Sequence, residues 1–240
     1  MKGDSLGDRM KTYYEGISRQ FLYRKIPVIM RLDGKAFHTF TKGCKKPFDD
    51  KIIETMQFTT ETLMRKIQGA KIAYVQSDEI SILISDYDAL ETCGWYDYNV
   101  QKMTSVSAAI ASVTFTLNYP DIETHLCDVD HAYFDSRVFN IPKEDVVNYF
   151  RWRYQDWVRN SRAMLAQSMF SQSELQGKNT VQQVQMCRAK GTDWENLEDV
   201  YKNGTLFYWA EVDGSKRLME TCSVNLNSND ECEGIFEDYV

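Results

Sequence analysis

The chain has 240 residues, of which 43% are hydrophobic, and a formal net charge of −7. This length and composition allow a sizeable buried core, and no apolar stretch approaches the roughly 20 residues that a membrane-spanning helix needs. The net charge argues against indiscriminate nucleic-acid binding, and six cysteines without a Cys-x-x-Cys pair argue against a zinc site or a dense disulfide framework. We therefore expect a cytoplasmic protein with reduced thiols.

The first predicted elements are a strand and a helix. Residues 27–32 form a short apolar run typical of a buried strand, and a loop rich in glycine, lysine and threonine follows it up to Pro47. Between residues 49 and 67 the apolar side chains recur on one helical stripe, with an aspartate at its start and Gly69 just past its end. This second segment is predicted to be a helix.

A hairpin, another helix and another strand follow. Residues 72–75 and 80–84 are β-branched runs separated by Gln-Ser-Asp-Glu, a pattern typical of a hairpin with Asp78 in its turn. Residues 98–113 predict a helix, and residues 132–141 predict a strand. The resulting order, β-α-β-β-α-β, is that of a ferredoxin-like α+β fold, which RNA-recognition modules and polymerase palms share.

A long amphipathic helix is predicted to follow this core. Pro142 opens the helix, and its apolar face includes Phe150 and Trp157. Arginines occupy an adjoining face, where they could contact phosphate or simply form a solvated edge.

The rest of the chain is less regular. The segment 171–203 is polar and weakly periodic, and residues 204–212 predict one more strand. The acidic end, 229–240, is expected to be loosely held. We expect a palm-like catalytic core over residues 1–141 and a helical and β extension over residues 142–240, packed together as one compact unit.

Two carboxylates mark the candidate site. In the predicted topology the first and third strands lie side by side, so Asp33 at the end of one and Asp78 in the hairpin turn should meet. Two adjacent carboxylates repel each other, and a hard cation such as Mg²⁺ relieves that repulsion. The arrangement is typical of metal-assisted phosphoryl or nucleotidyl transfer. Taken singly, each aspartate would more often be an ordinary turn residue than a metal ligand.

Basic residues are concentrated towards the N-terminus. Residues 1–66 contain 14 lysines and arginines against 8 aspartates and glutamates. A cluster such as Lys42, Lys45 and Lys46 could attract RNA or nucleoside triphosphates, or could form a solvated face. No Ser/His/Asp or Cys/His pattern accompanies the three histidines, so a covalent hydrolase is a poor fit.

Five stretches carry a resemblance to a known family. They are RLDGKAFHTF (31–40), KPFDD (46–50), AYVQSDEISI (73–82), FDSRVF (134–139) and YKNGTLFYW (201–209). Together and in this order they resemble the tRNA-histidine guanylyltransferase family and its Thg1-like relatives. The resemblance implies a palm-like enzyme, assembled as a homotetramer, that adds nucleotides to the 5′ end of tRNA in the 3′-to-5′ direction.

The resemblance also implies roles for individual residues. Asp33 and Asp78, with the backbone carbonyl of Gly34, would bind two Mg²⁺ ions, and Glu79 would act beside them as a further catalytic residue. GTP, ATP or another nucleoside triphosphate would be bound by residues of the stretch 31–40 and by three polar residues further along the chain. These are Gly34, Lys35, Ala36, Phe37 and His38 of the stretch, and Lys46, Ser77 and Lys102. We expect RNA contacts from the long helix, at Arg151, Arg159, Asn160 and Arg162.

The sequence departs from the family pattern in two places. The run 158–161 reads Val-Arg-Asn-Ser in place of His-Ile-Asn-Asn, and Asn99 stands where an arginine is expected shortly before Lys102. These differences favour the Thg1-like type, which repairs 5′-truncated tRNAs by template-dependent addition, over strict guanylate addition to tRNA-His. The alternatives are a palm-type nucleotide cyclase and a non-enzymatic RNA-binding module. The aliphatic strand 80–84 offers no base-stacking platform, which counts against the RNA-binding module.

Overall fold

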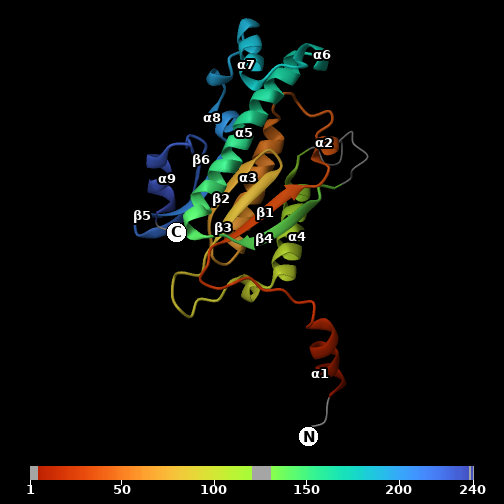
Figure 1. Ribbon diagram of the computed structural model, residues 1–240, viewed down its shortest axis with the longest axis vertical. Coiled ribbons are helices and arrows are strands. Elements are labelled where there is room, and N and C mark those ends of the chain that lie inside the picture. The colour runs from red at the N-terminus through yellow and green to blue at the C-terminus, as the bar shows by residue number, and fades with distance from the viewer. Residues whose placement is uncertain (1–4, 121–130, 238, 240) are drawn as a thin grey trace.

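The computed structural model describes residues 5–120, 131–237 and 239, which contain a six-stranded antiparallel sheet (Figure 1). Its spatial order is β4-β1-β3-β2-β5-β6. The strands are β1 (Val28–Gly34), β2 (Ala70–Gln76), β3 (Glu79–Ile84), β4 (Phe134–Asn140), β5 (Thr205–Val212) and β6 (Ser215–Thr221). The first and third strands are direct neighbours, as the predicted topology requires.

Two helices cover one face of the sheet. α3 (Asp50–Lys66) and α4 (Val100–Asn118) share an apolar core with alternate residues of the central strands. α3 begins where the Asp49 side chain accepts hydrogen bonds from the backbone N–H groups of Lys51 and Ile52. The predicted β-α-β-β-α-β core is therefore confirmed.

The predicted long helix, α5 (Val146–Met169), crosses the opposite face (Figure 1). Its buried residues Phe150 and Tyr154 pack in one cluster with Ile29 of β1 and Leu83 of β3. Because successive strand residues point to opposite faces, covering both faces explains why the central strands are apolar without alternation.

Residues 142–240 extend the same sheet. β5 pairs with β2, and β6 pairs with β5 after the turn at Asp213 and Gly214. The segment 171–203 is not irregular as its weak periodicity suggested, because short capped helices form there. They are α6 (Gln172–Leu175), α7 (Thr180–Ala189) and α8 (Asp199–Asn203), with a 3₁₀ turn at Trp194–Asn196.

The expectation of a loosely held acidic end is wrong for its described residues. α9 (Asn229–Phe236) ends on Phe236, which is only 2% exposed. The Phe236 ring lies 5.2 Å from that of Phe150 in α5, centroid to centroid. The acidic composition of the segment gave no sign that Phe236 is buried. Its burial holds the segment on the face of the sheet that α5 covers.

The remaining elements are short. α1 (Leu6–Met10) and a π-helical turn (Lys11–Glu15) extend away from the sheet (Figure 1). α2 (Phe37–Phe40) follows β1, and 3₁₀ turns occupy Trp95–Tyr98 and Lys143–Asp145. Over the part of the chain that the structure describes, no helix has both the length and the apolarity to cross a membrane.

Candidate functional site

β1 and the β2–β3 turn place Asp33 and Asp78 at the same end of the sheet. Asp33 is the penultimate residue of β1 and faces Glu79, the first residue of β3, across the ladder. The backbone N–H of Gly34 donates to the carbonyl oxygen of Asp78 over 3.0 Å. The structure thus brings together the two carboxylate-bearing residues that the predicted topology placed side by side.

The Asp78 carboxylate is electrostatically unfavourable where it lies. Burial raises its pKa, a hydrogen bond from the Ser77 hydroxyl at 2.9 Å lowers it, and the charges of Asp33 and Glu79 raise it further. Among the described residues, no three His, Cys, Asp or Glu side chains are grouped as metal ligands. A pair of carboxylates suits Mg²⁺, which takes one or two protein carboxylates and completes its coordination with water and substrate phosphates.

Asp78→Asn is expected to raise the melting temperature of the metal-free protein by about 2–4 °C, the shift that ~1 kcal/mol produces at this chain length. The raised pKa of the Asp78 carboxyl means that folding disfavours its ionised form. An uncharged amide of the same shape therefore removes a destabilising charge. Thermal unfolding at neutral pH with a chelator measures the shift. Asp213→Asn, at the exposed β5–β6 turn, is the matched control and should leave the melting temperature unchanged. A fall for Asp78→Asn would contradict this interpretation.

Two arginines hold Glu79 beside the paired aspartates. Arg153 of α5 donates from Nε and Nη2 to the two carboxylate oxygens of Glu79, each over 2.6 Å. Nη2 of Arg31 lies 2.6 Å from Glu79 Oε2 and 3.0 Å from Asp33 Oδ2. Burial raises the pKa of the Glu79 carboxyl, and Arg153 and then Arg31 lower it. The predicted catalytic residue Glu79 is therefore an ion-pair partner of two guanidinium groups.

Sequence reasoning missed both arginines, although signals for them were present. Arg153 follows Phe150 by three residues and precedes Trp157 by four, so it lies on the buried stripe of α5 and needs an acidic partner there. Arg31 precedes Asp33 by two residues and therefore shares its side of the strand.

The loop after β1 is fixed by an aromatic cluster. The Phe37 ring lies 5.2 Å from Phe40, 5.4 Å from Phe115 of α4 and 5.2 Å from Phe134 of β4, centroid to centroid. A side chain at Gly34 would collide with the Phe37 ring, so this position needs glycine for space. Burial of Phe37 therefore determines the path of the loop between Asp33 and α2.

This loop borders a recess that opens beside Asp78. The recess is lined by residues of the loop, of α2, of α3 and of the hairpin turn, namely Gly34, Ala36, Phe37, His38, Thr41, Ile52, Ser77 and Asp78. Most of the predicted nucleotide-binding residues of the loop are thus brought together with Ser77 and Asp78 around one recess.

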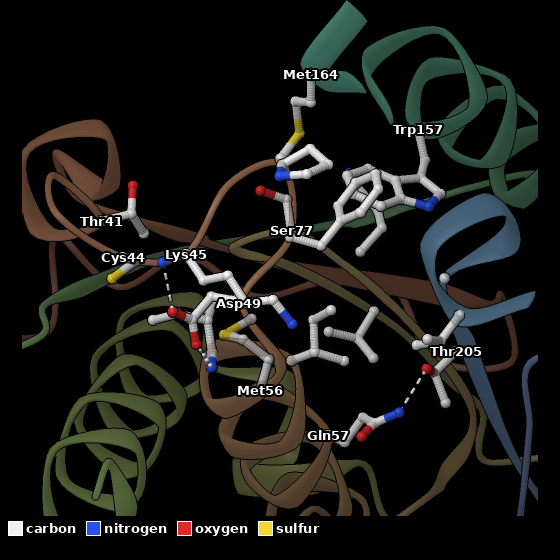
Figure 2. A pocket seen from close by; sticks show the side chains of 18 of the residues that line it. Thr41, Cys44, Lys45, Asp49, Met56, Gln57, Ser77, Trp157, Met164 and Thr205 are labelled. Carbon is white, nitrogen blue, oxygen red and sulfur yellow. Dashed lines mark hydrogen bonds between the residues drawn. The ribbon is translucent and has the colours of Figure 1, made fainter. Parts of the chain in front are cut away.

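A second, largely apolar recess adjoins the first and shares Thr41, Ile52 and Ser77 with it. Figure 2 shows Met56, Ser77, Trp157 and Met164 around this space, with Lys45 and Asp49 at one side. The buried indole N–H of Trp157 has no hydrogen-bond partner among the described residues. The two recesses together suit a ligand that is anionic at one end and planar and apolar at the other.

Three of the residues predicted to bind nucleotide have exposed side chains near these recesses. Lys35 extends over the Tyr133 ring, with Nζ 5.9 Å from its centroid, and His38 lines the first recess. Lys46 lines the second recess, with Nζ 3.4 Å from the carbonyl oxygen of Thr41. All three can approach a ligand without rearrangement of the core.

Lys102 is not brought to this site within the chain. It lies in the first turn of α4, where its Nζ is 5.8 Å from the Tyr96 ring centroid. Phe115, which contacts Phe37, lies 13 residues further along the same helix, or about 20 Å at the α-helical rise. Within a single chain, Lys102 therefore lies apart from the other predicted nucleotide-binding residues, and its role stays a prediction.

The arginines of α5 are largely engaged within the chain. Arg151 donates to the Leu226 carbonyl (3.1 Å) and to the Asn229 side chain (2.8 Å). Arg162 lies 4.1 Å from the Trp194 ring centroid. Arg151 and Arg162 therefore already contact neighbouring segments of the chain, and their contacts with RNA stay a prediction.

Two candidate RNA-binding residues of α5 stay accessible. The side chain of Arg159 is 67% exposed, although it pairs with Asp156, and Asn160 is exposed beside it.

The positions that depart from the family pattern have structural roles here. Asn99 caps α4 by accepting from the backbone N–H of Lys102 over 3.0 Å. Ser161 accepts a buried hydrogen bond from the Trp194 indole over 2.8 Å. Both side chains are thus used to fix local structure.

The chain is similar to known proteins over most of its length. The profile of the family described as "Thg1: tRNAHis guanylyltransferase" matches residues 7–142. A human protein named "Probable tRNA(His) guanylyltransferase" is 28% identical in an alignment over 201 residues, which covers 78% of this chain and 65% of the human protein. The chain thus spans about two thirds of the length of that relative.

Two solved structures of bacterial tRNA(His) guanylyltransferase (Thg1)-like protein are more similar. The one in complex with ATP has a TM-score of 0.87 and 38% identity, covering 97% of this chain and 98% of that one. The one in complex with GTP has a TM-score of 0.80 and 37% identity, covering 99% and 100%.

Proposed function

The chain belongs to the tRNAHis guanylyltransferase family, and we propose that it is a template-dependent nucleotidyltransferase that adds nucleotides to the 5′ end of tRNA in the 3′-to-5′ direction. The observation that carries this proposal is the meeting of Asp33 and Asp78 at one end of the sheet, where Asp78 lines a recess that adjoins a largely apolar one. Nucleoside triphosphates are the proposed substrates, supported by the similar bacterial structures whose titles name ATP and GTP.

The triphosphate is proposed to lie along the loop 34–38. The backbone N–H groups of Phe37 and His38 begin α2 and have no partner within that helix, so they can donate to phosphate oxygens. Ser77 in the hairpin turn and the ammonium group of Lys46 supply further donors. The base would enter the apolar recess beside Trp157.

Asp33, Asp78 and the backbone carbonyl of Gly34 are the proposed ligands of two Mg²⁺ ions. Such ions supply positive charge that lowers the pKa of an attacking hydroxyl and neutralises a leaving pyrophosphate. The chain's own contribution is to hold the backbone at Gly34 beside Asp78 through their hydrogen bond and to orient the Asp33 side chain with Arg31.

The proposed reaction joins the 3′-hydroxyl of an incoming nucleoside triphosphate to the 5′ end of the tRNA. A 5′-triphosphate end releases pyrophosphate directly. A 5′-monophosphate lacks a good leaving group, so ATP must first adenylylate it with loss of pyrophosphate, and the incoming 3′-hydroxyl then displaces AMP.

The test is to incubate the protein with 5′-truncated tRNA, Mg²⁺ and each nucleoside triphosphate, and to size the products. We expect lengthening by the nucleotide complementary to the opposite template base. A parallel reaction without RNA detects a nucleotide cyclase, which would consume triphosphate there. Unchanged RNA, or triphosphate consumed only in the reaction without RNA, would contradict the proposed function.

Strict guanylate addition to tRNA-His is the second candidate, supported by the name of the human relative. The repair activity is preferred because the bacterial Thg1-like proteins are more similar, at 38% and 37% identity against 28%. Addition of only guanylate, and only to tRNA-His, would reverse this preference.

A homotetramer is the proposed assembly. The N-terminal arm, residues 5–17, exposes large apolar side chains that the rest of the described chain does not cover, namely Leu6, Met10, Tyr13, Tyr14 and Ile17. Exposed apolar surface of this kind commonly marks a protein interface. Light scattering should give four times the 28.0 kDa chain mass, whereas a fully active monomer would exclude the assembly.

A further inference from the structure

Asp33 and Glu79 share one nitrogen atom of Arg31. Nη2 of Arg31 contacts Oδ2 of Asp33 at 3.0 Å and Oε2 of Glu79 at 2.6 Å. The buried Nε of Arg31 has no acceptor among the described residues. A single guanidinium group therefore serves two carboxylates that compete for it.

Burial favours Glu79 in this competition. The side chain of Glu79 is 7% exposed and that of Asp33 is 33% exposed. Attraction between opposite charges is stronger in the less hydrated position. An unneutralised Glu79 would therefore draw Arg31 away from Asp33.

Arg153 prevents this by neutralising Glu79. It contacts both carboxylate oxygens of Glu79 and also donates to Asp156 over 3.0 Å, so its guanidinium is fixed from α5. Its side chain is only 6% exposed. Because Arg153 already neutralises Glu79, the guanidinium of Arg31 can also contact Asp33.

We propose that Arg153 is a positioning residue that sets how Arg31 is divided between Glu79 and Asp33, and thereby how freely the Asp33 carboxylate can turn to a divalent cation. This inference rests on the proposed function, because it takes Asp33 as a cation ligand. Arg153 contacts Glu79 and acts on Asp33 through it.

The two single variants should have opposite effects. In Arg153→Met, Arg31 moves to Glu79, Asp33 is released and a positive charge is lost, so a divalent cation binds about tenfold more tightly. In Glu79→Gln, Arg31 moves to Asp33 and a negative charge is lost, so the cation binds about tenfold more weakly.

The double variant Arg153→Met/Glu79→Gln separates positioning from net charge. It has the same net charge as the wild type, yet of the two carboxylates that Arg31 contacts in the wild type only Asp33 remains. We expect cation binding about tenfold weaker than in the wild type. It also removes both members of a buried ion pair, so it stays informative if Arg153→Met alone does not fold.

The experiment is a Mn²⁺ titration without nucleotide, in which electron paramagnetic resonance measures the free ion. Arg65→Met is the matched control, because Arg65 forms an exposed ion pair with Glu61 on α3, and it should bind Mn²⁺ as the wild type does. A crystal structure of the metal-free double variant should show Arg31 on Asp33.

The outcomes are distinguishable. A double variant that binds Mn²⁺ as tightly as the wild type, or an Arg153→Met protein that is folded and binds no more tightly, would overturn the role of Arg153. If Asp33→Asn leaves wild-type Mn²⁺ binding unchanged, Asp33 is not a cation ligand and the proposed function itself fails. Variants that change only the melting temperature would assign Arg153 a purely structural role.

Discussion

Asp33→Asn and Asp78→Asn should each lower the rate of nucleotide addition about 1,000-fold, the effect of losing several kcal/mol of charge stabilisation in the transition state. Each substitution replaces the carboxylate of a proposed metal ligand by a neutral amide of the same shape, at the end of the sheet where Asp78 lines the first recess. The rate is measured by single-turnover extension of 5′-truncated tRNA at saturating Mg²⁺ and nucleoside triphosphate.

The stability of the Asp78 variant makes this result interpretable. Because Asp78→Asn should melt higher than the wild type without metal, its lost activity could not be attributed to unfolding. Asp213→Asn, which changes an exposed aspartate in the β5–β6 turn, should keep full activity. Wild-type rates in either Asp33→Asn or Asp78→Asn would remove that carboxylate from the proposed mechanism.

Phe37→Ala should lower the free energy of unfolding by about 3–5 kcal/mol, the usual cost of deleting a buried phenylalanine ring. Its side chain is 4% exposed and contacts three other rings from α2, α4 and β4, so a cavity would open between these elements. The measurement is equilibrium unfolding in urea.

The same substitution should weaken nucleotide binding, because Phe37 determines the path of the loop proposed to hold the triphosphate. Phe58→Ala is the matched control, since Phe58 on α3 is 47% exposed and its loss should change stability by no more than about 0.5 kcal/mol. Equal effects of the two substitutions would show that the aromatic cluster does not fix the loop.

The core of the fold could be predicted because its signals are local. The apolar run before Asp33 and the paired runs around Ser77 and Asp78 give strands by composition, and the stripe on α3 gives a helix by period. The hairpin from β5 to β6 was missed, although Asp213-Gly214 is a recognised hairpin turn signal.

The candidate site could be predicted only in part. The order of the strands shows which strand ends are neighbours, but it does not show which face of a helix meets the sheet. The order of strands was enough to bring Asp33 and Asp78 together. The ion pairs of Arg153 depend on how α5 is placed across the sheet, which no local pattern specifies. The position of Lys102 could not be predicted for the same reason, since the length of α4 separates it from the site within one chain.

The division of the chain after residue 141 remains a prediction. The strands on both sides of this boundary belong to one sheet, with β5 paired to β2. α5, which follows the boundary, supplies Arg153 to Glu79 of the core. A catalytic role for residues 1–141 would therefore require the extension for its charge balance.

The most direct measurement is a crystal structure with Mn²⁺ and GTP, in which anomalous scattering locates the ions. We expect Mn²⁺ between the carboxylates of Asp33 and Asp78, with the triphosphate along the loop from Gly34 to His38. Ions bound elsewhere, or the two carboxylates turned away from them, would contradict it.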